Sequence, residues 1–197
     1  MWTDETAITA RNLSSVLNSI EPNRSINETE IRYLMRYYRG DQPVWDKVKV
    51  ARPEINNIVV ENRANEIVAF KVGYLIGEPI QYVSRFGKSD EIEELNGMMF
   101  LEDKDDKDQE LVTDQMICGT AYRMVVPNQA GEDEAPFSIY TLNPENTFVV
   151  YTTALGNKPV LSGIRIPKEN GGCVTYCYTD TAFYEIVDGA LMRTEPN

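Results

Sequence analysis

The chain has 197 residues and an acidic composition, with 31 Asp and Glu against 19 Lys and Arg and a formal net charge of −12. Such a chain is not expected to bind nucleic acid broadly, because that affinity comes largely from Lys and Arg side chains that release counterions. The absence of histidine excludes Ser-His-Asp and Cys-His catalysis and the commonest metal sites.

Residues 1–57 are predicted to form two helices and an extended connection. A weak helical pattern covers residues 5–20, and the stretch "EPNRS" at 21–25 is expected to break it. A clearer helix follows over residues 27–40, where apolar side chains recur at i, i+3, i+4 and i+7 and a glycine marks the end. Residues 41–57 contain two prolines and show little periodicity, which favours an extended connection.

Residues 58–76 are predicted to form the longest helix. Plotted at 100° per residue, its apolar face consists of Val60, Ala64, Ile67, Val68, Tyr74 and Leu75. Lys71 falls in the middle of this face, and Glu66 and Gly73 lie on a flatter strip roughly opposite. A proline then ends the helix, and residues 79–84 have the pattern of a strand.

Two further helices are expected before residue 119. Ser89 is a candidate N-cap for a helix that runs to about Phe100. The acidic run at 102–110 leads into the next helix, which ends at Gly119, and its carboxylates suit the positive end of the helix dipole. Residues 58–118 therefore form the helical part of the predicted fold.

Residues 119–197 are expected to form the β part, because short β-branched and aromatic runs alternate with turn signals. The predicted strands are 120–127, 137–142, 147–152, 160–167, 173–179 and 182–187. Their spacing indicates an antiparallel meander or half-barrel. The final seven residues, "LMRTEPN", show no element. The predicted class is α+β, with helices first and strands after.

The sequence supplies no recognisable catalytic, metal or cofactor site. Neither GxxxxGK[ST] nor GxGxxG occurs, so the usual phosphate-binding loops are absent. Counted as a calcium-binding EF-hand loop from Asp103, the acidic run has Lys107 at position 5 and Asp108 where glycine is required. Cys173 and Cys177 would be about 13 Å apart on a flat strand, too far for one zinc ion. Three cysteines and the lack of a signal peptide or membrane span favour a soluble protein of the cytoplasm.

Several charged or small residues are candidates for contacts rather than chemistry. Arg32, Arg36 and Arg39 share a helix face that is either solvated or meets an acidic neighbouring chain or DNA phosphate. Lys71 must reach water or find a carboxylate, since burying its charge alone is costly. Gly73 costs about 1 kcal/mol in a helix interior relative to alanine and suits a position that another backbone approaches.

Four sequence blocks resemble portal proteins of tailed bacteriophages, in particular the portal type of long-tailed phages of Gram-positive bacteria. The blocks are "YYRGD" (37–41), "NNIVVENRANEIVAFKVGYLIGEPIQY" (56–82), "DQMICGTAYRMVV" (114–126) and "NPENTFVVYTTALGNKPVLSGIRI" (143–166). Together they cover most of residues 30–185 in the family's order. The resemblance therefore concerns much of the chain rather than one motif.

The resemblance implies a structural subunit of a ring, usually of twelve copies, at one capsid vertex. Such rings admit double-stranded DNA during packaging, dock the terminase motor and scaffold or capsid proteins, and later hold the head-to-tail connector. The chain would correspond to the N-terminal outer wing, truncated before the family's stem, clip and crown. The implied setting is the virion, after assembly in the bacterial cytoplasm.

A ring subunit needs heterologous interfaces, in which one patch meets a different patch of the neighbour. The candidate contacts are Arg32, Arg36, Arg39, Glu66, Gly73, Asp103, Asp105 and Asp106, with Lys71 as a buried or snorkelling charge. Two alternatives remain: a hydrolase that uses carboxylates such as Glu61, Glu66 or Asp114, and an adaptor whose β meander offers an exposed edge to partners.

Overall fold

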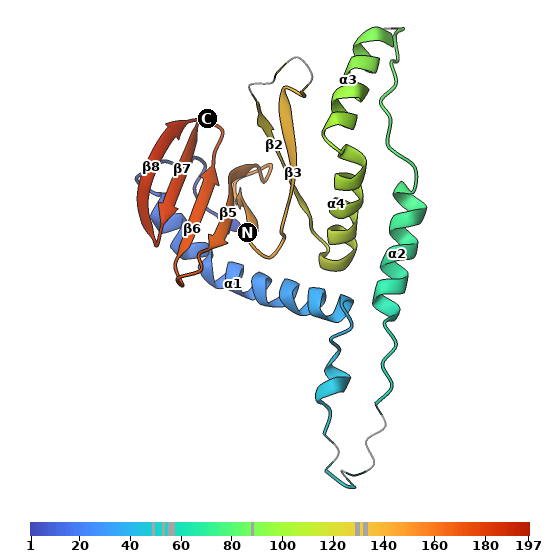
Figure 1. The fold of residues 1–197 in the computed structure, drawn as a ribbon. Coiled ribbons are helices and arrows are strands. Elements are labelled where there is room, and N and C mark those ends of the chain that lie inside the picture. Colours follow the sequence, from blue (N-terminus) through green and yellow to red (C-terminus); the bar gives the residue numbers. More distant parts are fainter. Residues whose placement is uncertain (49, 53, 55–57, 88, 129–130, 132–133) are drawn as a thin grey trace. The chain divides into compact units, whose positions relative to one another are not determined.

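The computed structural model describes residues 1–48, 50–52, 54, 58–87, 89–128, 131 and 134–197. Figure 1 shows helices early in the chain and mostly strands later, which confirms the predicted α+β class. The chain divides into two compact units: unit 1 comprises Met1–Ile31 and Asn143–Asn197, and unit 2 comprises Arg32–Leu142. The predicted division into residues 1–57, 58–118 and 119–197 stays a prediction.

Unit 1 is a six-stranded sheet covered by the first part of a long helix, α1 (Leu13–Tyr38). The strands are β1 (Trp2–Thr3), β4 (Thr147–Thr152), β5 (Pro159–Pro167), β6 (Cys173–Tyr178), β7 (Ala182–Val187) and β8 (Ala190–Pro196). Their order is β1-β4-β5-β6-β7-β8; β1 pairs in parallel with β4, and all other pairs are antiparallel. The predicted antiparallel meander is therefore confirmed for β4 to β7, and β8 extends it.

The core of unit 1 lies between α1 and the sheet. Its buried members are Ile8, Leu13, Val16, Ile20, Phe148, Val150, Leu161, Cys177, Tyr184 and Ile186. Residues 148, 150 and 152 of β4 are buried and their neighbours are half-buried, as the period of two in a one-sided strand requires. Gly163 lies opposite Phe148, and a Cβ at this glycine would lie within 3 Å of the Phe148 ring. Only glycine leaves room for that ring.

Besides the end of α1, the described residues of unit 2 form three α-helices, one turn of 3-10 helix and a hairpin. They are η1 (Pro43–Asp46), α2 (Arg63–Ile76), α3 (Ser89–Leu101), α4 (Lys104–Cys118), β2 (Tyr122–Pro127) and β3 (Phe137–Leu142), η1 being one turn of 3-10 helix. Helix α4 packs against α2 on one side and against β3 on another (Figure 1). Strands β2 and β3 form a separate two-stranded sheet, so the strands expected in one meander belong to two sheets.

The predicted break at 21–25 is wrong. Helix α1 continues through Pro22, and Arg24 bridges the expected break by pairing with Glu21 and Glu28, at 2.8 Å in both cases. These ion pairs and the buried side chains on either side compensate for the hydrogen bond that Pro22 cannot donate.

The predicted start of the helix at residue 58 is also wrong. Asn62 is the N-cap of α2: its side-chain oxygen accepts a hydrogen bond from the Asn65 backbone N–H at 3.2 Å. Its Nδ2 donates to the Tyr38 carbonyl at 2.8 Å, which ties the cap to the end of α1. Helix α2 therefore has 14 residues and α1, with 26, is the longer one.

Two expectations about strands are corrected as well. Residues 79–84 form no strand; the Asn96 side chain binds both the N–H and the carbonyl of Tyr82, at 3.1 Å each, in place of a neighbouring strand. The C-terminal residues, expected to have no element, form β8 along β7. The predicted connection at 41–57 and the side chain of the predicted cap Ser89 lie wholly or partly outside the described residues.

Candidate interaction surfaces

The groups that could carry chemistry are separated or protected. Burial raises the pKa of Cys177 to about 12, and burial together with the Asp114 charge raises that of Cys118 to about 11, so both thiols stay protonated near neutral pH. The pKa of Asp114 is itself raised, by burial and by Glu110. Throughout the described ranges, no group of three potential ligands could hold a metal ion.

The carboxylates considered for a hydrolase do not form one site. Glu61 and Glu66 both bind the Arg63 guanidinium, at 2.8 and 2.7 Å, on the exposed surface at the start of α2. Asp114 lies in α4. The arrangement stabilises the first turn of α2 and leaves no unpaired carboxylate pair there for acid–base work.

The basic surface predicted around Arg32, Arg36 and Arg39 lies at the C-terminal end of α1, and all three side chains are exposed. Arg36 Nε binds Asp41 Oδ2 at 2.6 Å, so part of its charge is already neutralised. Arg39 follows the last helical residue in a turn, where its N–H donates to the Met35 carbonyl. Positive charge at this end also suits the helix dipole.

The predicted inward face of helix α2 is confirmed at Val68 and wrong at Tyr74 and Leu75. Val68 and Ile76 are its buried residues, whereas Tyr74 and Leu75, expected to be inward, are exposed. Lys71 is exposed and reaches water; no ion pair of its side chain occurs within the part of the chain that the structure describes. An added Cβ at Gly73 would meet nothing within 4 Å, so the backbone expected to approach this residue does not belong to the described residues of this chain.

The predicted acidic run lies at the junction of α3 and α4. Asp103 adopts the left-handed conformation, with φ 48°, and precedes α4; Asp105 and Asp106 belong to its first turn. Glu102 faces inward: its Oε2 accepts from the Ile139 N–H at 2.8 Å and from Lys107 Nζ at 3.2 Å. The hydrogen bond from Ile139, assisted by Lys107, lowers the pKa of Glu102.

A buried ionic cluster in unit 2 was not found from the sequence. Asp108 binds Lys104, one helical turn earlier, and the Arg123 guanidinium of β2 at 2.6 Å; Lys104 also lies over the Tyr82 ring, 5.6 Å from its centroid. Burial alone would raise the pKa of Asp108, but the two cations outweigh it and the pKa is lowered. The i, i+4 spacing of Lys104 and Asp108 is the sequence feature from which their ion pair could have been predicted.

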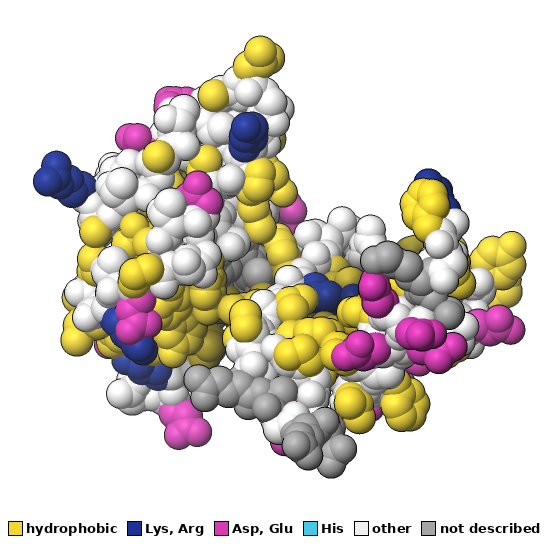
Figure 2. All heavy atoms as spheres, turned by 90° about the horizontal axis from the view of Figure 1, so that it is seen from above, with side chains coloured by type: hydrophobic (Ala, Val, Ile, Leu, Met, Phe, Trp, Pro, Cys, Tyr) yellow, Lys and Arg dark blue, Asp and Glu magenta, His cyan; other side chains and the backbone are white. Residues whose placement is uncertain are grey.

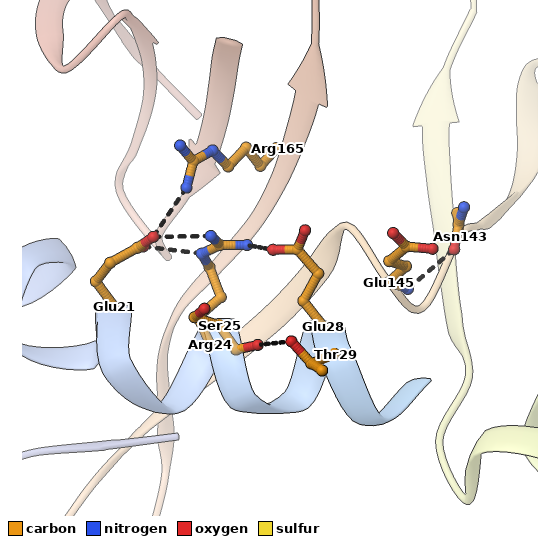
Figure 3. A network of polar contacts seen from close by, with 8 residues as sticks. All are labelled: Glu21, Arg24, Ser25, Glu28, Thr29, Asn143, Glu145 and Arg165. Carbon is orange, nitrogen blue, oxygen red and sulfur yellow. Dashed lines mark hydrogen bonds and ion pairs between the residues drawn. The ribbon is translucent and has the colours of Figure 1, made fainter. Parts of the chain in front are cut away.

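A second ionic network lies in unit 1 on α1 (Figure 3). Besides Arg24, Glu21 also binds Arg165 of β5, at 3.0 Å, so the network joins the helix to the sheet. A cavity of about 230 Å³ lies beside it, with Phe148 and Ile186 among its apolar lining residues. Because Arg24 and Arg165 are already bound to carboxylates, the cavity offers no free cation from them to an anionic ligand.

The surface of unit 2 combines acidic and hydrophobic side chains. Figure 2 shows several acidic groups among exposed hydrophobic ones over the helical part, on the right of that view. Large apolar side chains exposed there include Phe70, Tyr74, Phe86 and Phe100. Among the helices described, none is long and apolar enough to cross a bilayer.

These features define a mixed α+β protein of two compact units with exposed charged and apolar side chains. A family model described as phage portal protein, SPP1 Gp6-like, matches residues 18–192, and the chain belongs to this family. The match confirms the resemblance read from the sequence and gives the chain a structural role in the phage virion. No curated protein matches the chain.

Proposed function

We propose that this chain acts as a subunit of the portal ring through which double-stranded DNA enters and leaves the capsid. The observation that carries the proposal is the family match over residues 18–192, which covers parts of both compact units. The net charge of −12 is in keeping with a conduit, because a broadly acidic protein does not hold DNA phosphates. The role requires no catalysis.

The ring of about twelve copies would also bind other proteins of the phage head. We propose that it docks the terminase, contacts scaffold or capsid proteins and holds the head-to-tail connector, after assembly in the bacterial cytoplasm. Residues 58–118 and 119–197 would be the helical and β parts of the outer wing. DNA would pass through without sequence-specific binding.

Ring contacts between copies must be heterologous, because a closed ring repeats one contact from each copy to the next. The proposed positive surface is that of Arg32, Arg36 and Arg39, all exposed. The proposed negative surface is that of Asp103, Asp105 and Asp106, and the exposed strip of Glu66 and Gly73 lies on α2 between its capped start and its end. The open space beside Gly73 supports an approach by another chain.

The proposal is tested by immunogold electron microscopy of virions from the phage that encodes the chain. Antibody against the chain should label one vertex per particle, and antibody absorbed with the purified chain is the control. Labelling spread over the capsid would assign the chain to another head component. Absence of label from every particle would remove it from the virion.

The positive surface is tested in the same phage by replacing Arg32, Arg36 and Arg39 together with Glu. The exposed positions predict normal folding, while reversal of three charges should reduce the yield of DNA-filled heads at least about tenfold. Arg193→Glu in β8 is the matched control, since Arg193 is also exposed but belongs to unit 1. A normal yield from the triple variant would remove this surface from the interface.

A further inference from the structure

Helix α2 carries an exposed apolar surface, which we call the α2 stripe. It consists of Ile67, Phe70, Lys71, Tyr74 and Leu75, at the i, i+3, i+4, i+7 and i+8 positions that share one side of a helix. The Phe70 side chain is 73% exposed and Tyr74 is 81% exposed, and their rings stack with centroids 6.4 Å apart. The stripe is thus ordered along the helix and faces water.

The α2 stripe is as large as the largest apolar patch of a typical monomer, and patches of that size are often functional. With large side chains of 150–250 Å² each, the exposed fractions amount to on the order of 500 Å² of apolar area. The largest apolar patch of a typical monomer is about 300–600 Å², and one side of a standard protein interface is about 800 Å². The stripe alone could therefore supply more than half of one side.

The charge within the stripe restricts its occupant. Lys71 lies among the apolar side chains, and within the described ranges no carboxylate pairs with it. By contrast, Arg63 near the start of the helix is bound by Glu61 and Glu66, and Arg36 is bound by Asp41. An occupant that matches the stripe brings apolar side chains with a carboxylate beside them.

The same unit carries a surface of that kind, which we call the acidic turn: Phe100, Leu101, Asp103 and Asp106. The two apolar side chains at the end of α3 are 78% and 55% exposed. Both aspartates are exposed and, for the residues described, neither forms an ion pair, whereas Glu102, which precedes Asp103, binds Lys107. Apolar area and unpaired negative charge therefore occur together here.

We propose that the α2 stripe of one copy of this chain binds the acidic turn of a second copy. Because the two surfaces consist of different residues, the contact is heterologous and leaves each pair with one free stripe and one free acidic turn for further copies. The inference rests on the proposed function, since it names the surfaces by which portal subunits meet. It assigns Lys71, whose side chain forms no ion pair with the described residues, to the acidic turn, and leaves the surface of Arg32, Arg36 and Arg39 to a separate contact.

Charge exchange between the two surfaces is the sharpest test, with sedimentation velocity from 5 to 200 µM as the measurement. One variant carries Lys71→Glu and the other carries Asp103→Lys with Asp106→Lys. The wild-type chain should associate as its concentration rises, and each variant alone should associate about tenfold more weakly because like charges then face each other. An equimolar mixture should recover the wild-type association, since each variant's stripe then matches the other's acidic turn.

The apolar part is tested with Phe70→Ser combined with Tyr74→Ser. Loss of two aromatic anchors at the centre of an interface should weaken association about thirtyfold or more. Phe86→Ser is the matched control, because Phe86 is 89% exposed and lies outside both surfaces. Unchanged far-UV circular dichroism of all variants shows that the fold is kept, as expected for exposed positions.

A wild-type chain that stays monomeric at 200 µM would overturn the proposal, as would variants that associate normally or a mixture that does not recover. These results are separate from the immunogold test. Label at one vertex together with unaffected association of the variants would keep the portal role and reject this interface. Recovered association in the mixture together with unlabelled virions would keep this interface and reject the portal role.

Discussion

Replacing Pro22 with Ala should stabilise unit 1, because α1 passes through this position without a break. The helix extends from Leu13 to Tyr38, so Pro22 lies in its interior and cannot donate the backbone hydrogen bond of that turn. The side chain is exposed, so the change removes no core contact. Alanine at the same position would restore the missing donor.

The expected gain is about 2 kcal/mol in the free energy of unfolding. Proline in a helix interior is about 3 kcal/mol less favourable than alanine. This gain in the free energy of unfolding is reduced by about 1 kcal/mol, because proline restricts the unfolded chain and the alanine variant loses that restriction. With a urea dependence of about 1–3 kcal/mol per molar, the unfolding midpoint should rise by about 1 M.

The two tryptophans allow unit 1 to be followed by itself. Trp2 lies in β1, with its ring 5.5 Å from that of Tyr151, and Trp45 lies in η1 of unit 2. A Trp45→Phe background leaves Trp2 fluorescence as the report on unit 1. Pro43→Ala is the control, because Pro43 begins η1 in the other unit and its replacement should not move the Trp2 midpoint. A midpoint that stays or falls with Pro22→Ala would mean that the helix ends near residue 21.

Two further predictions concern the core and the acidic junction. Leu161→Ala should destabilise unit 1 by about 3 kcal/mol in urea unfolding, since the side chain is fully buried, while Leu155→Ala at a fully exposed position should change nothing measurable. Because the Ile139 N–H and Lys107 lower the pKa of Glu102 below its ordinary 4.5, Glu102 should stabilise unit 2 above that pH and lose its effect as the pH falls through the lowered value. The difference in stability between wild type and Glu102→Gln should therefore shrink on acidification; a difference that grew would contradict the assignment, and the exposed Glu93→Gln is the control.

Strands β3, β4 and β7 were the most predictable elements, since the predicted bounds of β3, 137–142, are also those of the structure. The predicted bounds of β4 and β7, 147–152 and 182–187, are those of the structure. In β4 and β7 the buried residues recur at every second position, so the side-chain pattern of the sequence marks these strands. Turn residues between the strands then fix where each one ends.

Elements held by backbone pairing were not visible in the sequence. Strand β8 pairs with β7 over its whole length, yet most of its side chains are exposed and show no alternation. Strand β1 has two residues, and its register with β4 depends on contacts about 148 positions away, such as that of the Met1 ammonium with the Val149 carbonyl. Hydrogen bonds of the main chain do not depend on side-chain type, so periodicity cannot reveal them.

The apolar surface of α2 was found in the sequence, but three of its side chains, Ile67, Tyr74 and Leu75, are exposed rather than buried. Both sides of this helix carry apolar residues, and only the packing of α4 determines that Val68 and Ile76 face inward. The sequence therefore identified Lys71 as an ammonium within an apolar surface and placed that surface in the core. Because Lys71 is exposed in the structure, it needs no buried carboxylate. Its charge is available to a partner of the kind proposed above.

The two units differ in which side chains they bury and which they expose. The contiguous apolar core described above belongs wholly to unit 1, including its part of α1. Unit 2 instead buries Lys104 and Asp108 while exposing Phe70 and Phe100. Because burying an ion pair contributes little net stability and exposing large apolar groups forgoes hydrophobic stabilisation, unit 2 gains most from contacts outside itself. If the proposed assembly forms, it should stabilise unit 2, since any partner that binds the folded form stabilises it.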